Sequence, residues 1–149
     1  MNRTTILIAC LIAFICGSAT AAKIGSVESS REQAGNEAPK AFDQLPSTRW
    51  AAEGRGVWIQ CSFETEVEIE ELGIGFHAPE RNYSFHLQTS LDGANWSAPA
   101  KLESQSRSGV VTYKIIPRQA RLLRITVFGS DANDWANIHT IHILSLIHI

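Results

Sequence analysis

The sequence predicts an all-β sandwich of about eight short strands, and three observations support this fold class. Apolar residues alternate with a period of two over much of the chain after residue 56, which is typical of half-buried strands. Glycine, proline, asparagine and aspartate separate these segments at short intervals, as turns between antiparallel strands require. No window of about twelve residues beyond residue 22 shows a helical period, which argues against a parallel α/β sheet.

The alternating segments can be assigned in order along the chain. They are residues 57–63, 67–69, 74–76, 85–87, 111–115, 120–128 and 138–143. Before them, residues 23–39 are largely polar, and Ile24 and Val27 predict a loose first strand followed by a loop. Between them, Gly93 supplies the positive φ of a tight hairpin turn, and Pro117 ends a strand.

The composition indicates one globular domain without a strong electrostatic field. The chain has 149 residues, of which 44% are apolar and 19% charged, and a formal net charge of -2. A domain with so small a net charge does not attract polyanions, so the sequence predicts no nucleic-acid partner. Cys10 and Cys16 lie close to the N-terminus, which leaves Cys61 without a partner for a disulfide or a cysteine-based zinc site. We interpret Cys61 as a buried thiol and not as a nucleophile.

The first 22 residues have the pattern of a secretory signal peptide. Asn2 and Arg3 precede an apolar run over residues 6–16, and a stretch of small residues follows. The small-x-small rule favours cleavage after Ala21. We therefore expect a secreted protein, extracellular or periplasmic. We expect no membrane span, because the apolar run is about half of the roughly 20 residues that a span needs.

The last six residues, 144–149, resemble the in-frame translation of a sequencing-library adapter. On this interpretation they are not part of the natural protein, and the gene continues beyond them, where an appended catalytic domain could follow. The alternative is a genuine strand end. The predicted domain therefore spans residues 23–143.

Five segments of this domain resemble the motifs of one known family, in the same order. They are 41–50 (AFDQLPSTRW), 56–60 (GVWIQ), 89–96 (TSLDGANW), 120–125 (ARLLRI) and 130–138 (SDANDWANI). Together they resemble a discoidin domain, also called the coagulation-factor type C domain, and most closely the family 32 carbohydrate-binding modules attached to bacterial polysaccharide lyases. The resemblance implies an eight-stranded antiparallel jelly-roll β-sandwich of the galactose-binding-like type, which binds ligands with loops at one end.

The resemblance also implies a structural calcium site. The ligands carried over are the carbonyls of Lys40 and Leu45, the carboxylate of Asp43, and the carbonyl and hydroxyl of Thr48. Coordination by oxygen alone suits a hard cation. However, the late glutamate of the family is Thr140 here, and the glycine after the aspartate is Gln44, so calcium binding should be severely weakened. The alternative is that Asp43 caps the loop by accepting backbone N–H bonds.

The candidate ligand-binding residues lie in three predicted loops. A sugar needs an apolar face and planar polar groups, and an acidic sugar also needs Arg or Lys. The candidates are Arg49, Trp50, Glu53, Arg55, His77, Arg81, Tyr83, Asn133 and Trp135. Three arginines on a slightly acidic chain suit a carboxylated polysaccharide, and Arg81 is the strongest single candidate.

Several of these residues have a structural alternative. Arg49 and Trp50 belong to a Thr-Arg-Trp loop that can be structural throughout the family, and Arg81 can be a solvated or ion-paired loop residue. Trp135 serves either as a stacking platform or as a plug beneath its loop. His77 is either a ligand contact or a half-buried histidine at a strand end.

Other prominent side chains are assigned structural roles. Trp58 and Trp96 are interpreted as packing residues of the sheets, and Arg124 as an anchor for a loop. His139 and His142 are three residues apart on one predicted strand, hence on opposite faces, and cannot ligate one metal ion together.

The favoured function is that of a secreted, non-catalytic carbohydrate-binding module, which holds an attached polysaccharide-degrading enzyme on an alginate-type or other acidic glycan. The alternative is a cell-surface adhesion or phospholipid-binding discoidin protein, which needs protruding apolar residues at loop tips with basic neighbours. A free-standing enzyme is disfavoured, because the sequence shows no Ser-His-Asp arrangement, paired-carboxylate loop or nucleotide-binding glycine motif. Calcium is the only cofactor that the resemblance implies.

Overall fold

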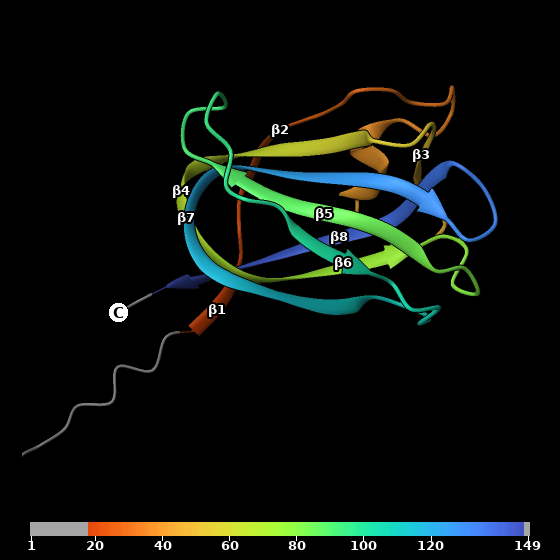
Figure 1. Ribbon diagram of the computed structural model, residues 1–149. Helices are drawn as coiled ribbons and strands as arrows, with labels where there is room; N and C mark the ends of the chain where they lie inside the picture. The colour runs from red at the N-terminus through yellow and green to blue at the C-terminus, as the bar shows by residue number, and fades with distance from the viewer. Residues whose placement is uncertain (1–17, 148–149) are drawn as a thin grey trace, which may run out of the picture.

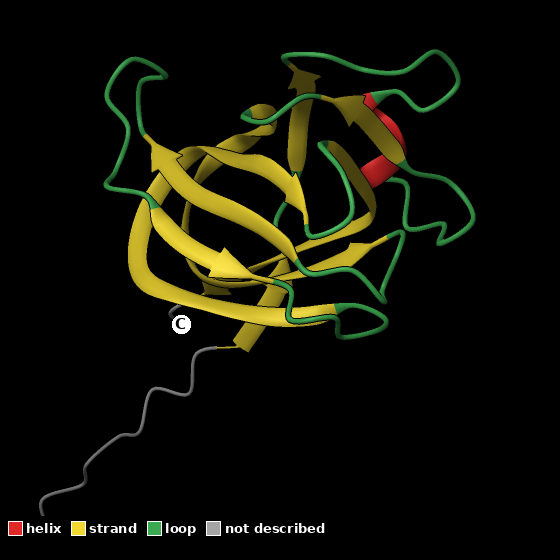
Figure 2. Cartoon of the chain, turned by 45° about the vertical axis from the view of Figure 1, so that its right-hand side comes forward, coloured by secondary structure: helices red, strands yellow, loops and turns green. Residues whose placement is uncertain are grey.

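A computed structural model describes residues 18–147, and it consists of two layers of antiparallel strands (Figure 1). The strands are β1 (Ser18–Ala21), β2 (Ile24–Ser29), β3 (Trp50–Glu53), β4 (Val57–Phe76), β5 (Tyr83–Ser90), β6 (Ala100–Glu103), β7 (Val111–Ser130) and β8 (Trp135–Ile147). One short 3₁₀ helix, η1 (Ala38–Ala41), interrupts the connection from β2 to β3, as Figure 2 shows in red. The predicted all-β fold class and its eight antiparallel strands are confirmed.

The two longest strands, β4 and β7, pass through both layers because each bends in its middle. Residues 57–62 of β4 pair with residues 122–127 of β7, and residues 67–74 pair with residues 111–120. The register shifts between Ser62 and Val67, and such irregularities bend a strand and increase its twist. One pair of strands therefore turns the corner of the sandwich.

The remaining strands complete the layers on either side of this pair. The order along the sheet is β1-β8-β4-β7-β5-β6, and β2 also pairs with β4 while β3 pairs with β8. The first half of β4 thus lies in a layer with β2, β5 and β6, and its second half lies in a layer with β8, β3 and β1.

The sequence pattern predicted several short strands where the structure has the two long strands β4 and β7. The predicted segments 57–63, 67–69 and 74–76 are parts of one strand, and the predicted strand end at Pro117 falls inside β7. Pro117 lies where the ladder shifts register, between Lys114, paired with Glu71, and Arg118, paired with Ile69. A proline at such an irregularity removes no ladder hydrogen bond, so the strand continues past it.

The core lies between the two layers and is built from the inward residues of both. Ile59, Leu123 and Ile125 come from one layer and Ile74 and Ile138 from the other, and all are at most 1% exposed. Cys61 lies among them, and burial raises the pKa of its thiol to about 12, which makes the thiolate unavailable at neutral pH.

Both ends of the described chain join the sandwich. Residues 18–21 in β1 pair with residues 144–147 in β8, so the sandwich extends beyond the expected limits of residues 23 and 143. The reason is that every second side chain of β8 still points into the core at this end of the strand, since Ile143 and Ser145 are both buried. The adapter and the signal peptide stay predictions. Most of the signal segment, residues 1–17, and the last two residues, 148–149, lie outside the described residues.

The connections between strands define two ends of the sandwich. In Figure 1 the connections 30–49, 77–82, 104–110 and 131–134 lie together on the right, and we call this the loop end. The bends of β4 and β7 and the connection 91–99 lie on the left, and we call this the bend end. Within residues 18–147 no helix is long and apolar enough to cross a membrane.

Candidate functional site

The first group of loop-end side chains is built where β3 meets the start of β8. Glu53 pairs with Trp135 in the antiparallel ladder, so both side chains leave the sheet on one face. The connection after β3 is held against the same loop, because Gly54 N–H donates to the Asp134 carbonyl at 2.7 Å and Arg55 Nη1 lies 3.3 Å from Asp134 Oδ1. We call Glu53, Arg55, Asp134 and Trp135 the Trp135 cluster. It brings two carboxylates, a guanidinium and a half-buried indole together.

The loop that carries Asn133 is fixed by its own hydrogen bonds. Ser130 N–H donates to the Asn133 carbonyl at 2.8 Å, and Trp135 N–H donates to Asn133 Oδ1 at 3.1 Å. Gly129 approaches this loop with φ of 83°, and a Cβ there would lie 2.7 Å from the Asn133 carbonyl oxygen. Glycine alone tolerates both the conformation and the contact. Asn133 therefore positions Trp135 through its Oδ1.

The second group of side chains comes from the connections on either side of β4. His77 follows β4 directly, and its backbone N–H donates to the Asn137 carbonyl at 3.0 Å. His77 is exposed. Its pKa is lowered by partial desolvation and by the neighbouring charges of Arg49, His139 and Arg81, while the charge of Glu80 raises it. The charges of Arg49 and Arg81 thus both act on the His77 imidazole at the loop end, and we call these three predicted residues the His77 cluster.

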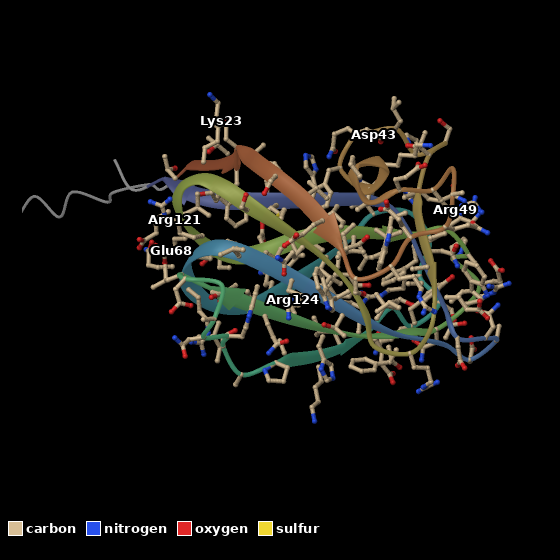
Figure 3. The ribbon with its side chains drawn as sticks, turned by 90° about the horizontal axis from the view of Figure 1, so that it is seen from above. Lys23, Asp43, Arg49, Glu68, Arg121 and Arg124 are labelled. Carbon is tan, nitrogen blue, oxygen red and sulfur yellow. The ribbon has the colours of Figure 1, made fainter. Side chains whose placement is uncertain are left out.

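Arg49 contributes an unpaired donor to the His77 cluster. Its Nε is buried and has no hydrogen-bond partner among residues 18–147. Buried donors in folded proteins are nearly always paired, so this N–H lacks an acceptor, and a ligand can supply one only if the Arg49 side chain shifts to expose it. Figure 3 shows Arg49 and Asp43 at the loop end, opposite Glu68 and Arg121 at the bend end.

Arg81 is held in place but remains able to exchange its partner. Its backbone N–H donates to the Ala78 carbonyl at 3.1 Å, and its carbonyl accepts from the Ser104 hydroxyl at 3.2 Å. Its Nε lies 3.8 Å from Glu80 Oε1, with the Arg81 side chain 31% exposed. The ion-paired alternative is therefore present in the structure. Surface pairs of this kind contribute at most about 1 kcal/mol, so a ligand carboxylate can compete for the guanidinium.

Two predicted ligand contacts, Trp50 and Tyr83, are wrong because both side chains are 0% exposed. Both occupy inward positions of their strands. Trp50 Nε1 donates to the Arg31 carbonyl at 3.0 Å, and the Tyr83 ring stacks on Phe76 with their centres 4.4 Å apart. Burial raises the pKa of Tyr83. The structural alternative for Trp50 is confirmed.

The loop with the predicted calcium ligands brings its oxygen atoms together. Thr48 Oγ1 lies 2.5 Å from Asp43 Oδ2, 3.1 Å from the Leu45 carbonyl and 3.3 Å from the Lys40 carbonyl. One hydroxyl hydrogen cannot satisfy three acceptors, and an oxygen-rich group of this kind suits a hard cation. Asp43 also accepts the Leu45 backbone N–H at 2.9 Å through Oδ1, which is the loop cap of the alternative interpretation.

Thr140, which takes the place of the second carboxylate residue in the predicted calcium site, supplies no carboxylate. Thr140 is 7% exposed, and its hydroxyl lies 2.7 Å from His139 Nδ1. Gln44 keeps a glycine-like φ of 62°, and its Nε2 donates to the Ile141 carbonyl of β8 at 3.2 Å. The described residues contain no group of three or more His, Cys, Asp or Glu side chains that could hold a metal ion. The donor set therefore fits calcium only in part.

The model of the F5/8 type C domain matches residues 25–141. The chain belongs to the F5/8 type C domain family. The family resemblance drawn from the sequence is thereby confirmed, although no curated protein matches the chain.

Solved structures show the same F5/8 type C fold in carbohydrate-binding modules. A pectin-binding carbohydrate-binding module is 32% identical, with a TM-score of 0.77 over 82% of this chain and 91% of its own. The CBM32 of AlyQ, solved in complex with 4,5-unsaturated mannuronic acid, is 25% identical, with a TM-score of 0.79 over 83% of this chain and 97% of its own. A truncated AlyQ with CBM32 and alginate lyase domains is 23% identical over 90% of this chain and 35% of its own, with a TM-score of 0.82, which supports the fold alone.

Asp134, which belongs to the same predicted binding loop as Asn133 and Trp135, pairs with Arg55. One residue of this F5/8 type C domain was missed as a candidate. His139 lies close to Gly75, where a Cβ would approach its ring to 2.3 Å. The sequence held no signal for His139, because its placement depends on a register shift between β4 and β8 at Gly75.

Proposed function

We propose that this domain is a non-catalytic carbohydrate-binding module that binds a carboxylated polysaccharide at its loop end. The observation that carries the proposal is the His77 cluster at the loop end, where the charges of Arg49 and Arg81 both act on the His77 imidazole. The unpaired buried Nε of Arg49 supplies a donor at the same place. Guanidinium groups form charge-assisted hydrogen bonds with carboxylates that are about twice as strong as neutral ones.

On this proposal the Trp135 cluster, which lies at the same end of the sandwich, supplies the remaining contacts. The half-buried indole of Trp135 offers an apolar face for the C–H side of a sugar ring, and the exposed Glu53 and Arg55 offer partners for its hydroxyl groups. The Arg55 to Asp134 ion pair and the loop bonds of Asn133 hold this arrangement before a ligand arrives. On this proposal Trp135 is a stacking platform.

The similar structures support the same class of ligand. Pectin and unsaturated mannuronic acid both carry carboxylates, and they are the ligands named for the two carbohydrate-binding modules described above. The three loop-end arginines were assigned to this chemistry from the sequence, independently of these comparisons.

We propose further that the domain is exported and that it tethers an attached polysaccharide-degrading enzyme to its substrate. AlyQ supplies the precedent of a CBM32 joined to an alginate lyase domain. Such tethering raises the local concentration of the enzyme at the polysaccharide without any catalysis by the module itself.

Affinity electrophoresis tests the ligand class directly. We expect the migration of the protein to be retarded in gels that contain alginate or polygalacturonate, and to be unchanged in gels with neutral galactan. The double variant Arg55→Ala/Arg81→Ala should lose most of this retardation, because each charge-assisted hydrogen bond contributes about 1.5 to 3 kcal/mol. Arg121→Ala at the bend end is the matched control and should migrate like the unchanged protein.

The same preparation distinguishes the adhesion or phospholipid-binding alternative. Leu45 is 52% exposed in a loop-end connection, which is the kind of protruding apolar residue that membrane binding needs. Sedimentation with vesicles containing phosphatidylserine should leave the protein in the supernatant. Sedimentation with the vesicles, together with unretarded migration in every polysaccharide gel, would reverse the assignment in favour of the alternative.

A further inference from the structure

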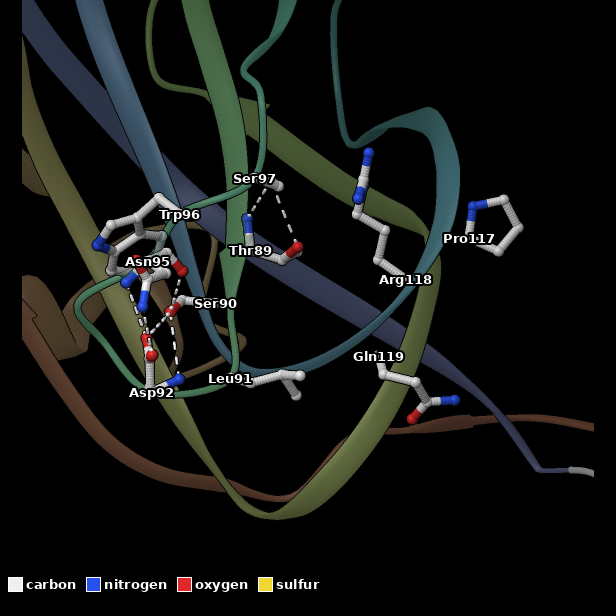
Figure 4. A pocket seen from close by; sticks show the side chains of 10 residues that line it. All are labelled: Thr89, Ser90, Leu91, Asp92, Asn95, Trp96, Ser97, Pro117, Arg118 and Gln119. Carbon is white, nitrogen blue, oxygen red and sulfur yellow. Dashed lines mark hydrogen bonds between the residues drawn. The ribbon is translucent and has the colours of Figure 1, made fainter.

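A groove at the bend end has the composition of a ligand site, although none of the candidate residues lies there. It is an open groove with a volume of about 540 Å³ between the connection after β5 and the bend of β7 (Figure 4). Ligand pockets in proteins have volumes of about 300 to 1,000 Å³. Its apolar lining includes Leu91, Trp96 and Pro117, and its polar lining includes Asp92, Arg118 and Gln119.

One wall of the groove is fixed by the hydrogen bonds of Asp92. Its Oδ1 accepts the backbone N–H groups of Ala94 and Asn95 at 2.9 and 2.8 Å, and its Oδ2 accepts Asn95 Nδ2 at 2.7 Å. These bonds hold the pKa of the Asp92 carboxyl well below its usual range. The carboxylate is thus occupied within its own loop, and this wall is rigid before any ligand binds.

The indole of Trp96 is also held in position. The guanidinium carbon of Arg124 lies 4.2 Å from the centre of the Trp96 ring, so the indole is supported by a cation–π contact. Trp96 remains half-exposed and lines the groove. An immobilised aromatic side chain of this kind can take the C–H face of a sugar at little cost in conformational entropy.

The opposite wall carries polar groups that have no partner. Arg118 and Gln119 are exposed, and within residues 18–147 their side chains form no hydrogen bond or ion pair. Figure 4 shows Arg118 across the groove from Asp92 and Trp96. The groove therefore combines an aromatic wall with a free guanidinium on the other side.

The apolar lining continues past Arg118. A second cavity of about 180 Å³ shares Thr89, Ser97 and Arg118 with the first and is otherwise mainly apolar. Ile116, which is 75% exposed, is part of this lining. Arg118 thus stands at the junction of two adjoining cavities.

We propose that this groove is a second carbohydrate site, which takes a carboxylated sugar with its ring against Trp96 and its carboxylate on Arg118. The choice of an acidic sugar rests on the function proposed above, because it assumes the same polysaccharide at both ends. The groove itself is independent of the loop-end clusters. A module with a site at each end can bind two chains of one polysaccharide at once.

The four tryptophans make the two sites separately observable. In ¹H–¹⁵N NMR spectra the indole N–H of Trp96 reports on the groove and that of Trp135 on the loop end, while the buried Trp50 is an internal control. Titration with trigalacturonate and with trimannuronate should shift the Trp96 signal. Arg118→Ala should weaken the groove affinity about tenfold or more and leave the Trp135 response unchanged. Arg121→Ala, which changes an exposed arginine of β7 outside the groove, should alter neither response.

The outcomes separate this proposal from the proposed function. A Trp96 signal that does not move with either acidic trisaccharide overturns the groove site, whatever happens at Trp135. So does a Trp96 shift that Arg118→Ala leaves unchanged, or one that neutral galactotriose reproduces. A Trp135 signal that stays fixed while Trp96 responds overturns the loop-end site alone.

Discussion

The guanidinium group of Arg124 stacks on Trp96, with its central carbon 4.2 Å from the centre of the ring. The same carbon lies 4.3 Å from the centre of the Trp58 ring, and Arg124 Nε donates to Gln60 Oε1 at 2.9 Å. One cation of β7 therefore joins β4 to the connection after β5. The structural roles expected for these two tryptophans agree with this packing.

We expect Arg124→Ala to lower the free energy of unfolding by about 1 to 3 kcal/mol, because it removes two cation–π contacts and one hydrogen bond. Arg124→Lys should recover only part of this loss, since an ammonium lacks the planar face. Urea denaturation measures both. The control Arg121→Ala should stay within about 0.5 kcal/mol of the unchanged protein. Equal stability of Arg124→Ala and the unchanged protein would show that the stack is incidental.

Gly129→Ala tests the close approach that positions the Trp135 cluster. We expect it to cost about 2 to 4 kcal/mol, because it combines a strained positive φ with a clash against the Asn133 carbonyl. Gly109→Ala is the matched control, since Gly109 has a φ of 73° but no neighbour within 4 Å of a built Cβ. Thermal and urea unfolding compare the two, and equal losses would refute the role of the contact.

Binding of an acidic oligosaccharide should depend on pH through His77. Partial burial and neighbouring cations lower the pKa of free His77, whereas a ligand carboxylate in the same place would raise it. Binding is then linked to proton uptake, so affinity should rise several-fold as the pH falls from 8 to 5.5. Calorimetric titration with trigalacturonate at both pH values measures the effect. His77→Gln should remove the dependence, and a dependence that survives this change would exclude His77.

Stability should show the opposite pH dependence. Burial lowers the pKa values of His77, His86 and His139 below the usual 6.5. The unfolded chain therefore binds more protons than the folded one below about pH 6.5, so stability is fully present above this pH and falls as the pH drops through it. Melting temperatures between pH 8 and 5 should show the decline. His139→Gln should flatten the decline more than His142→Gln, a change at an exposed position.

Calcium should stabilise the unchanged protein little, because the oxygen-rich loop has one carboxylate, Asp43. Adding a second carboxylate by Thr140→Glu should strengthen binding, since calcium affinity rises with the charge of the ligand set. The measurement is the difference in melting temperature between millimolar calcium and a chelator, which reports binding to the folded state. We expect a larger difference in Thr140→Glu than in the unchanged protein. A large difference that Asp43→Ala abolishes in the unchanged protein would contradict this expectation.

The fold was largely predictable, since period-two alternation identifies half-buried strands wherever only one face is covered. The pattern could not show that β4 and β7 are continuous, because a bend is set by pairing between residues far apart in sequence. It also could not separate Trp50 and Tyr83 from exposed loop residues, since each lies at the boundary between a loop and a strand. Arg49 and His77 could be predicted to lie at one end because loops at one end of a sandwich converge, and their contact with a ligand stays a prediction. The groove at Arg118 was missed because its walls are about 20 residues apart in sequence and meet only through the bend.

The pairing of β1 with β8 gives the predicted export step a structural cost. Cleavage after Ala21 would remove the whole of β1, whose residues 18–21 occupy one edge of β8. The backbone N–H and C=O groups of residues 144–147 on that edge would then face solvent as an unprotected edge strand. Such an edge can accept a strand from another molecule. Because β1 is itself the outermost strand of the sheet, maturation would move the open edge from β1 to β8.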